Sequence, residues 1–456
     1  MLVEAGPALG GTAVFSGGWI HVAFGAKTWD DFRRVCPEGD PVLMRVLFDN
    51  FSRYCRWLEA TGAPGHYGRT ASFRNLAPME LYEMGSKLPR DHAKWFAFLG
   101  DRFRSLGGKL LLRTRARALA LEGGQVVGLD ADCDGKSLSI HARSVVLATG
   151  GFQNSPRLLA ENLGASPDNC TARAVTHDIG DGLVMATDVG AKLTSSMDTV
   201  YGHLVPAPPC EIRWHGSSPD PGLLTVFYAE SGIVVNIHGE RFADEGLGEL
   251  SGELVNSAIK QPPGGLWVIF DNEVRRRYVP LEFPRSYLWR PYNARHINLV
   301  RYFRPITTRH GERVIAIDGF QLARDRGAVV VEGQTIEALA RRLAEYGVAE
   351  ERLVATISEY NAATRDEKAQ DLSIPKGRFA YGITHPPLYA MKVAAGVSMT
   401  YGGVAINERA QVLDQKDQVI PGLYAVPGTA GGVFKTHYGG ALASCGVFGM
   451  IAGEQA

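Results

Sequence analysis

The chain has 456 residues, 45 % of them hydrophobic and 21 % charged, and its 48 basic and 48 acidic side chains cancel to a formal net charge of zero. Such a composition is typical of a soluble globular protein and excludes an intrinsically disordered one. Because nucleic acids and anionic membranes attract basic proteins, we expect neither of them as a partner.

The first hundred residues predict helices after a short strand. A brief apolar run ends at Glu4 and is followed by a glycine-rich segment, residues 10–18. Apolar residues at helical spacing predict helix within 28–62 and a further helix over 91–106. The second of these patterns stops at Gly107-Gly108, which is typical of a helix end.

The next segment predicts short strands. A strand begins at 110–112, and alternating apolar and polar residues then predict an antiparallel meander over 116–121, 126–131 and 137–141. The run 144–151 is apolar and enters Gly150-Gly151, which is typical of a buried strand in a parallel sheet.

The composition changes near residue 201. The stretch 201–395 is rich in proline, arginine and aromatic residues, and it predicts helices over 336–346 and 351–364. From residue 396 onward, glycine pairs and apolar strands return. We therefore expect a cofactor domain built from residues 1–200 and 396–456, with a second domain, residues 201–395, inserted between its two parts.

Six glycine pairs favour a large bound cofactor. A single pair is usually loop punctuation, but glycine also allows the backbone to approach a ligand closely. Several of these pairs directly follow apolar runs. The pairs are Gly10-Gly11, Gly17-Gly18, Gly150-Gly151, Gly402-Gly403, Gly431-Gly432 and Gly439-Gly440.

The six cysteines are scattered without CxxC spacing, so we expect free thiols, a reducing compartment and no metal site. No run of 18 apolar residues is present, and we therefore expect no membrane span. Since no signal-peptide pattern is found either, the expected location is the cytoplasm.

Several motifs occur in a fixed order along the chain. They are Gly-Gly-Thr through Ser-Gly-Gly at 10–18, Ala-Thr-Gly-Gly-Phe at 148–152, Gly-Asp-Gly at 180–182, Asn-Ile-His-Gly-Glu-Arg-Phe-Ala-Asp-Glu at 236–245, Ile-Pro-Gly-Leu-Tyr-Ala at 420–425, and a glycine-rich C-terminal helix that starts near 442. Together they resemble the fumarate reductase/succinate dehydrogenase flavoprotein family over the whole chain. The resemblance implies an α/β fold, with a Rossmann-like FAD-binding domain and an inserted α+β capping domain.

The resemblance also implies FAD as the cofactor, held without a covalent bond. Glu4 would accept the adenosine ribose hydroxyls, the 10–18 loop would lie against pyrophosphate and flavin, and Ala116 would meet the adenine. Backbone N–H groups at the start of the last helix would stabilise charge on the reduced flavin. The implied FAD-binding residues are Glu4, Gly10, Gly11, Thr12, Ser16, Gly17, Gly18, Ala116, Ala148, Thr149, Gly150, Gly151, Asp181, Gly428, Leu442 and Ala443.

The start of the chain departs from the family pattern. A dinucleotide fold opens with a strand, a GxGxxG turn and a helix, whereas this chain begins at the second strand. We expect the first strand and loop, roughly 30 residues on the usual size of a βαβ unit, to be lacking. The expected cause is a misassigned or truncated start, and the alternative is a degenerate relative that does not hold FAD.

The catalytic residues of the dicarboxylate members are also not matched. No arginine closely follows Glu245, no histidine precedes Gly402-Gly403, and Thr436 stands where those members have an arginine. The pattern is closer to the tricarballylate dehydrogenase-like and ketosteroid dehydrogenase-like branches. We expect Arg241 and Asp244 to have a structural role.

Three residues remain as candidate acid–base groups. His203 falls at the position of a capping-domain histidine that faces substrate in dicarboxylate members. Tyr401 and Tyr438 are tyrosines near the expected flavin, where a proton donor or acceptor is needed.

We therefore expect an FAD-dependent oxidoreductase that adds or removes hydrogen across a C–C bond beside a carboxylate or ketone of a small molecule, in the manner of tricarballylate dehydrogenase. A 3-ketosteroid 1-dehydrogenase-like desaturase is one alternative, and a non-catalytic relative without FAD is another. Because no haem or iron–sulfur motif is present, electrons would pass to a separate carrier or to oxygen.

Overall fold

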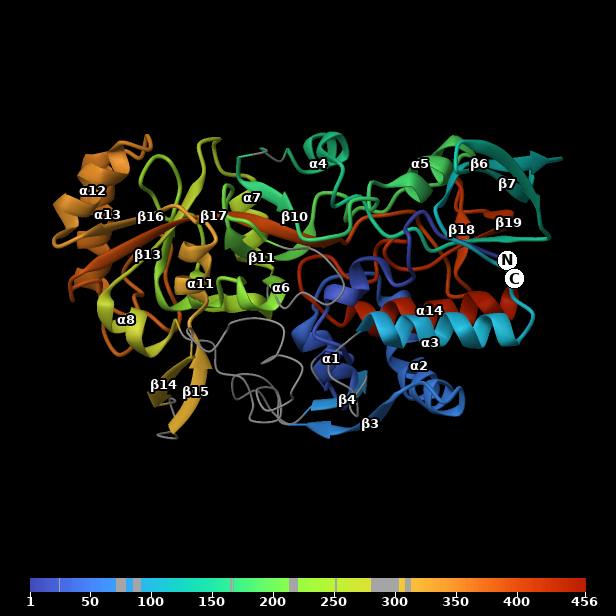
Figure 1. The fold of residues 1–456 in the computed structure, drawn as a ribbon, viewed down its shortest axis with the longest axis horizontal. Coiled ribbons are helices and arrows are strands. Elements are labelled where there is room, and N and C mark those ends of the chain that lie inside the picture. Colours follow the sequence, from blue (N-terminus) through green and yellow to red (C-terminus); the bar gives the residue numbers. More distant parts are fainter. Residues whose placement is uncertain are drawn as a thin grey trace.

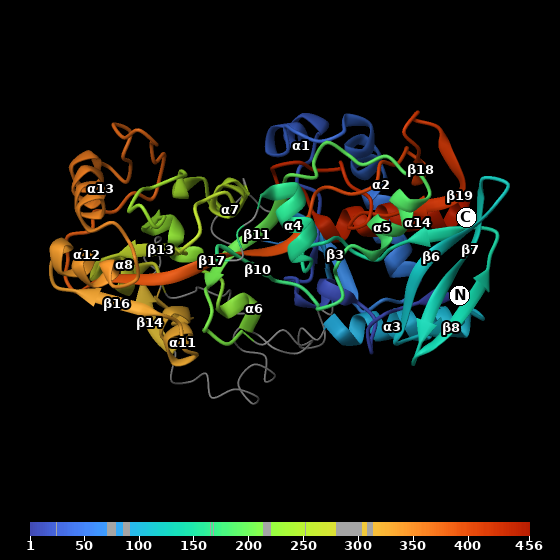
Figure 2. The ribbon, with the colours of Figure 1, turned by 90° about the horizontal axis from the view of Figure 1, so that it is seen from above.

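The computed structural model describes residues 1–23, 25–70, 79–84, 92–164, 166, 168–212, 220–250, 252–279, 303–307 and 313–456. The molecule is elongated, and both chain ends lie at the same end of it (Figures 1 and 2). Strands and helices from the middle of the chain form the opposite end, which we call the cap end.

The helices of the first hundred residues follow their sequence signals. α1 (Trp29–Val35) begins at Thr28, which forms a capping box with Asp31. α2 (Pro41–Ala60) begins at Asp40, whose carboxylate accepts two backbone N–H groups of the first turn. Its apolar stripe packs against α14 (Ala441–Gln455). α3 (His92–Ser105) confirms the helix predicted over 91–106.

Two separate parallel strand pairs lie at the end that holds the chain termini. β1 (Leu2–Val3) pairs with β5 (Leu110–Leu111), while β9 (Val145–Leu147) pairs with β19 (Val419–Ala425), which also pairs with β18 (Gln411–Leu413). Among the described residues no strand joins these two sheets.

The expected burial of the apolar run around β9 is wrong for Val146 and Ala148, which are both exposed. Val146 is 38 % exposed, whereas Val145 and Leu147 are buried. Side chains of successive strand residues point to opposite faces, so Val146 lies on the face that the flanking residues do not share.

The predicted meander is confirmed. It consists of β6 (Thr114–Glu122), β7 (Gln125–Cys133) and β8 (Lys136–His141), joined by tight turns.

One long strand, β17 (Leu388–Thr400), runs from the cap end toward the chain termini (Figures 1 and 2). It pairs with β13 (Leu266–Phe270) and β16 (Val330–Gly333) in its first half, and with β10 (Cys170–Ala172) and β11 (Val200–Pro206) in its second half. β12 (Ile233–Val235) extends the sheet beyond β13. This sheet takes strands from each of the three expected segments, so it does not separate one domain from the other. The domain boundaries at 200 and 395 therefore stay a prediction.

The cap end has its own apolar core. The two helices predicted there are confirmed as α12 (Ile336–Ala344) and α13 (Glu350–Ala363). Trp267 of β13 and Tyr360 of α13 are fully buried in this core.

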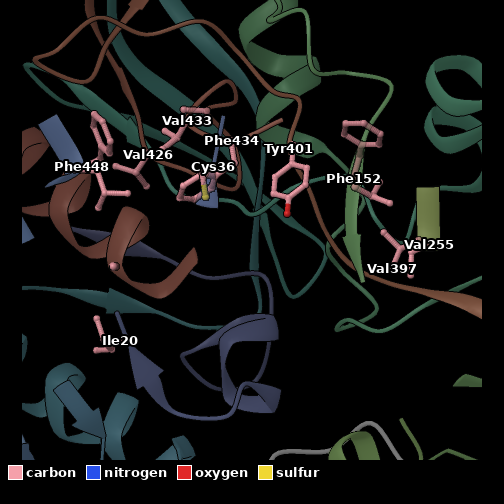
Figure 3. Close-up of a cluster of buried hydrophobic side chains, with 14 of the residues drawn as sticks. Ile20, Cys36, Phe152, Val255, Val397, Tyr401, Val426, Val433, Phe434 and Phe448 are labelled. Atoms are coloured by element: carbon pink, nitrogen blue, oxygen red, sulfur yellow. The ribbon is translucent and has the colours of Figure 1, made fainter. Parts of the chain in front are cut away.

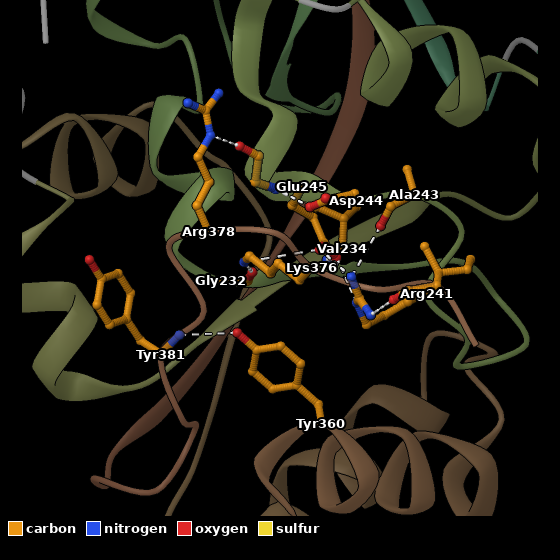
Figure 4. Close-up of polar contacts among 12 residues, drawn as sticks. Gly232, Val234, Arg241, Ala243, Asp244, Glu245, Tyr360, Lys376, Arg378 and Tyr381 are labelled. Atoms are coloured by element: carbon orange, nitrogen blue, oxygen red, sulfur yellow. Dashed lines mark hydrogen bonds and ion pairs between the residues drawn. The ribbon is translucent and has the colours of Figure 1, made fainter. Parts of the chain in front are cut away.

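A buried ionic cluster joins the segment around Arg241 to that around Lys376 (Figure 4). The Arg241 guanidinium donates to both oxygens of Glu245, at 3.0 and 2.6 Å. Lys376 donates to the carbonyl of Gly232 and lies 4.0 Å from the Glu245 carboxylate, and burial lowers the pKa of Lys376 to about 8. Asp244 accepts backbone N–H groups, and these contacts support the structural role expected for this segment.

The remaining elements are β2 (Trp19–Ile20), β3 (Gly65–Thr70), β4 (Met79–Met84), α4 (Pro156–Leu163), α5 (Asp181–Asp188), α6 (Asp220–Leu223), α7 (Glu253–Ile259), α8 (Asn272–Arg277), β14 (Phe303–Thr307), β15 (Arg313–Ile317), α11 (Gly319–Asp325) and the 3-10 helices η1 (Gly11–Phe15), η3 (Phe227–Ser231) and η4 (Glu245–Leu250). No helix within the described ranges combines the length and the apolar character needed to cross a membrane.

Candidate functional site

Glu4 lies directly after β1, as the sequence predicts. One oxygen of its carboxylate accepts the backbone N–H of Gly6 at 2.6 Å and lies 3.4 Å from Nε2 of His177. The carboxylate is partly exposed, so it can still accept hydroxyl groups from a ligand on its open side.

The glycine-rich segment 10–18 is tied to a buried carboxylate that the sequence did not single out. Thr12, in η1, donates its hydroxyl hydrogen to Asp178 and accepts the N–H of Val175 at 3.0 Å. Gln153 donates to the same oxygen of Asp178 at 2.8 Å. Burial raises the pKa of Asp178 to about 6, although the hydrogen bond from Thr12 opposes this shift.

Open space borders the same segment at two glycines. A Cβ atom added to Gly11 or to Gly17 would meet no other atom within 4 Å. Ser16 accepts the N–H of Gly18 at 3.2 Å and so helps to hold this loop. Gly10, in contrast, lies against Phe96 and has no such space.

The turn Ala148-Thr149-Gly150-Gly151 after β9 is hydrogen-bonded to two other segments, the start of α5 and the segment around Thr429. The Thr149 hydroxyl accepts the N–H of Gly182 at the start of α5 and lies 3.0 Å from the Thr429 hydroxyl. A Cβ on Gly428 would lie 3.1 Å from Cα of Gly150, so two of the glycines expected at the cofactor pack against each other. Close contact between backbones is therefore part of what these glycines permit.

Ala116 and Asp181 come together in one surface groove. The groove has a volume of about 420 Å³. Asp181 at the start of α5 forms a bidentate ion pair with Arg115, at 2.6 and 2.7 Å. The other lining residues are Arg117, Asn154, Ser155, Pro156, Arg157, Ile179, Val184 and Met185.

The first turn of α14 carries Leu442 and Ala443. Its N-cap residue is Gly440, at φ 109° and ψ 80°, which has no side chain to cap the helix. A side chain at Gly440 would overlap the carbonyl oxygen of His21, so α14 begins in direct contact with the segment after β2. His21 is buried there, and burial lowers its pKa to about 4, which keeps the imidazole neutral.

Tyr401, at the end of β17, is 3 % exposed. Within the described part of the chain its hydroxyl has no hydrogen-bond partner. Burial raises the pKa of Tyr401 well above its usual value, and the nearby hydroxyls of Tyr201 and Tyr438 add to this effect. Figure 3 shows the Tyr401 ring between Phe434 on one side and Phe152 and Val397 on the other, with its hydroxyl directed away from Val433.

Tyr438 and His203 meet through a residue that the sequence analysis missed. Tyr201 stacks on Tyr438, with ring centroids 4.0 Å apart and planes inclined by 19°. The Tyr201 hydroxyl also lies 3.0 Å from Nε2 of His203. Burial raises the pKa of Tyr438 to about 12, while a hydrogen bond from the backbone of Ala441 opposes the shift.

The structure therefore groups the predicted residues in three places. Ala116 and Asp181 lie in the groove. Thr12 and Gly150 lie beside Asp178. The acid–base candidates gather around Tyr201 near the start of α14. A sequence signal for Tyr201 exists, because residues 201 and 203 share one face of a strand.

Comparison with known proteins gives a consistent result. The family described as FAD binding domain matches residues 1–448. A probable fumarate reductase of Shewanella frigidimarina is 27 % identical, over 100 % of this chain and 70 % of its own length. A 3-oxosteroid 1-dehydrogenase of Mycolicibacterium smegmatis is 26 % identical, over 76 % of this chain and 59 % of its own.

Solved structures confirm the expected α/β fold. The open form of a flavocytochrome c3 fumarate reductase matches with a TM-score of 0.66 and 25 % identity, over 100 % of this chain and 73 % of that one. The 3-ketosteroid Δ1-dehydrogenase of Sterolibacterium denitrificans matches with a TM-score of 0.69 and 18 % identity, over 100 % of this chain and 94 % of that one.

Proposed function

The chain belongs to the family described as FAD binding domain, whose cofactor and oxidoreductase class it shares, and from this premise we propose that it adds or removes hydrogen across a C–C bond next to a ketone or a carboxylate. The observation that carries the proposal is the cluster at the start of α14. It places a buried Tyr401 hydroxyl, which has no hydrogen-bond partner among the described residues, near a Tyr201 hydroxyl bonded to His203.

The residues present fit FAD. The N–H groups of Leu442 and Ala443 lie in the first turn of α14, whose N-cap residue is a glycine without a capping side chain, and such groups stabilise negative charge. Gly11 and Gly17 border open space, and Glu4 is partly exposed after its strand. When bound, the flavin supplies a two-electron acceptor or donor.

The site favours a ketone over a dicarboxylate. Thr436, which stands where dicarboxylate members carry an arginine, donates its hydroxyl hydrogen to Glu38 at 2.6 Å. Tyr201, Tyr438 and Phe227 supply aromatic surface instead. Because a charged hydrogen bond contributes about 1.5–3 kcal/mol, neutral hydroxyls cannot replace an arginine on a carboxylate.

Relatives named for different substrates support a carboxylate or a ketone as the group beside the C–C bond. One is named NADH:acrylate oxidoreductase in Vibrio harveyi, and another is named 4-oxocyclohexanecarboxylate 2-dehydrogenase in Sinomonas cyclohexanicum. We favour a cyclic ketone over the tricarballylate-like substrate because of the aromatic rings at the site. A separate electron carrier or oxygen would complete the reaction.

The test is anaerobic reduction of FAD on the full chain reconstituted with the cofactor. We expect bleaching of the flavin absorbance by 4-oxocyclohexanecarboxylate or a 3-oxosteroid, and little with succinate or tricarballylate. Faster bleaching by succinate would contradict the substrate class. Failure to take up FAD at all would support the non-catalytic alternative.

A further inference from the structure

We propose that Asp178 binds FAD in its protonated form and donates the hydrogen on Oδ1 to an acceptor atom of the cofactor, so that the protein takes up a proton when it takes up FAD. The proposal rests on the cofactor of the proposed function and not on its substrate. Asp178 is then a cofactor-binding residue whose protonation sets the affinity for FAD.

Asp178 lies between two segments that are expected to hold the cofactor. Thr12 of the 10–18 loop donates its hydroxyl hydrogen to Oδ2 of Asp178. A Cβ atom added to Gly150, in the turn after β9, would lie 2.7 Å from Oδ1. One oxygen of the carboxyl group therefore faces the loop, and the other faces the glycine turn.

The two oxygens of Asp178 differ in their partners. Oδ2 accepts hydrogen bonds from Thr12 and from Gln153, the second at 2.8 Å. Within the described residues no donor is bonded to Oδ1. The backbone carbonyl of Asp178 accepts the N–H of Asn154 at 2.9 Å, which fixes the residue in place. Since 6 % of the residue stays accessible, we take Oδ1 to be the atom left for a ligand.

A second polar atom at the same turn lacks a partner. Gln153 is buried, and its Oε1 has no hydrogen-bond partner in the described part of the chain. A Cβ atom added to Gly151 would lie 2.6 Å from this Oε1. Because buried polar groups are normally hydrogen-bonded, two unpaired oxygens beside one glycine turn indicate that a ligand completes the network.

The chemistry of FAD requires a proton on Asp178. The diphosphate oxygens of FAD accept hydrogen bonds and cannot donate them, and an ionised carboxylate is also an acceptor only. A proton on Oδ1 replaces the repulsion between two anions by a hydrogen bond. Burial already raises the pKa of Asp178 to about 6, although the hydrogen bonds from Thr12 and Gln153 oppose this shift.

The charged groups around Asp178 act on its pKa in opposite directions. Glu4, after β1, raises the pKa, and the neighbouring His177 lowers it. These two side chains lie 3.4 Å apart and form an ion pair when the imidazole is protonated. At the start of α5, Asp181 is paired with Arg115 through two hydrogen bonds. Asp178 is therefore left without a cation of its own that would keep it ionised beside an anionic ligand.

The affinity for FAD should therefore fall as the pH rises. Below a pH of about 6 most of the protein already carries the proton, so the affinity is highest and independent of pH. At higher pH, each unit leaves about one tenth as much of the protonated form, and the dissociation constant rises about tenfold. The rise ends where the pH exceeds the raised pKa of Asp178 in the complex.

The experiment measures the dissociation constant of FAD for the full chain, by fluorescence titration without substrate between about pH 5 and pH 9. Asp178→Asn keeps an oxygen for Thr12 and Gln153 and offers an amide N–H to the cofactor. We expect this variant to bind FAD independently of pH, and near pH 8 at least as tightly as the wild type. The matched control is Asp188→Asn, an exposed residue at the end of α5, which should keep the wild-type pH profile.

Calorimetry of the wild type provides a second measurement that needs no variant. Titration with FAD in two buffers of different ionisation enthalpy gives the number of protons taken up, which we expect to be about one near pH 8. Circular dichroism shows that Asp178→Asn is folded.

Four outcomes are distinguishable. An affinity that rises with pH and is lost in Asp178→Asn would mean that Asp178 binds FAD as a carboxylate, and it would overturn the proposal. A dissociation constant independent of pH, or a pH dependence that Asp178→Asn retains, would overturn it as well. No FAD binding at any pH would overturn it together with the proposed function. FAD bound with the expected pH dependence, but reduced by no ketone, would overturn the proposed function alone.

Discussion

The buried hydroxyl of Tyr401 lowers the stability of the folded protein. It is buried without a partner among the described residues, whereas the equally buried Tyr82 donates to the carbonyl of Ala63 at 2.8 Å. An unsatisfied buried polar group costs about 1–3 kcal/mol, and a satisfied one contributes about 1 kcal/mol.

We therefore predict that Tyr401→Phe leaves the ligand-free protein as stable as the wild type or stabilises it, by up to about 1–3 kcal/mol, in urea unfolding. Tyr82→Phe, as the control, should lose about 1 kcal/mol. Tyr401→Phe should at the same time weaken binding of the ketone 4-oxocyclohexanecarboxylate, because under the proposed function this hydroxyl donates to the substrate. Destabilisation by Tyr401→Phe equal to that of Tyr82→Phe would contradict this assignment.

Single residues were the hardest part of the site to predict. His203, Tyr401 and Tyr438 were predicted because family motifs fix their positions along the chain. Tyr201 and Asp178 were not, because their roles arise from contacts with residues far away in the sequence. Tyr438 lies more than two hundred positions from Tyr201, and Thr12 is 166 positions from Asp178.

The start of α14 is the element on which most of the site depends. Its N-cap residue, Gly440, has a positive φ and lies against the carbonyl of His21. Any side chain there must move the backbone that carries His21 or the helix start that carries Leu442. Farther along the same helix, a Cβ at Gly449 would meet no other atom within 4 Å.

We predict opposite results for two glycine-to-alanine changes in this region. Gly440→Ala should lower FAD affinity by at least tenfold and destabilise the protein, because of strain at the helix start. Gly449→Ala, inside the helix, should stabilise by about 0.5–1 kcal/mol and leave FAD affinity unchanged. Fluorescence titration with FAD and thermal unfolding measure both effects, and normal FAD affinity in Gly440→Ala would exclude the α14 start as the flavin contact.

The helices and the meander were predicted well because their patterns lie in residues that are neighbours in the sequence. Helical spacing predicted α2, α3, α12 and α13, with Gly107-Gly108 marking the end of α3, and alternation predicted the meander. The pairing of β17 with four other strands could not be read from the sequence, since it depends on partners as distant as Cys170 and Val330. This strand determines where Tyr401 and β11 lie.

At the scale of the whole molecule, β17 links the cap end to the end that holds the chain termini and the candidate site. It pairs with β13 at Val393 and with β10 at Ala395, only two residues farther along. Because the two pairings are so close together, β17 cannot separate from β13 and still keep its pairing geometry with β10. We therefore expect the two ends to lose their structure together.

The buried ionic cluster of the cap end makes this expectation testable. The Glu245 carboxylate faces two buried cations, Arg241 and Lys376, and also accepts the N–H of Val234 at 2.9 Å. Glu245→Gln retains acceptor capacity but removes the negative charge that acts most strongly on both cations, and the weaker effect of Asp244 compensates them only in part. Breaking a buried ion pair in this way costs about 3–5 kcal/mol.

We predict that Glu245→Gln lowers the thermal midpoint and speeds hydrogen exchange in β13 and in α14 alike, and that FAD is released at the same lowered midpoint. Glu240→Gln is the control in the same segment, because its ion pair with Arg352 is exposed and contributes about 1 kcal/mol at most. Hydrogen exchange by mass spectrometry and flavin fluorescence follow the two ends separately. Faster exchange confined to β13, with α14 protected and FAD retained, would show that the cap end unfolds alone and that β17 does not couple it to the site.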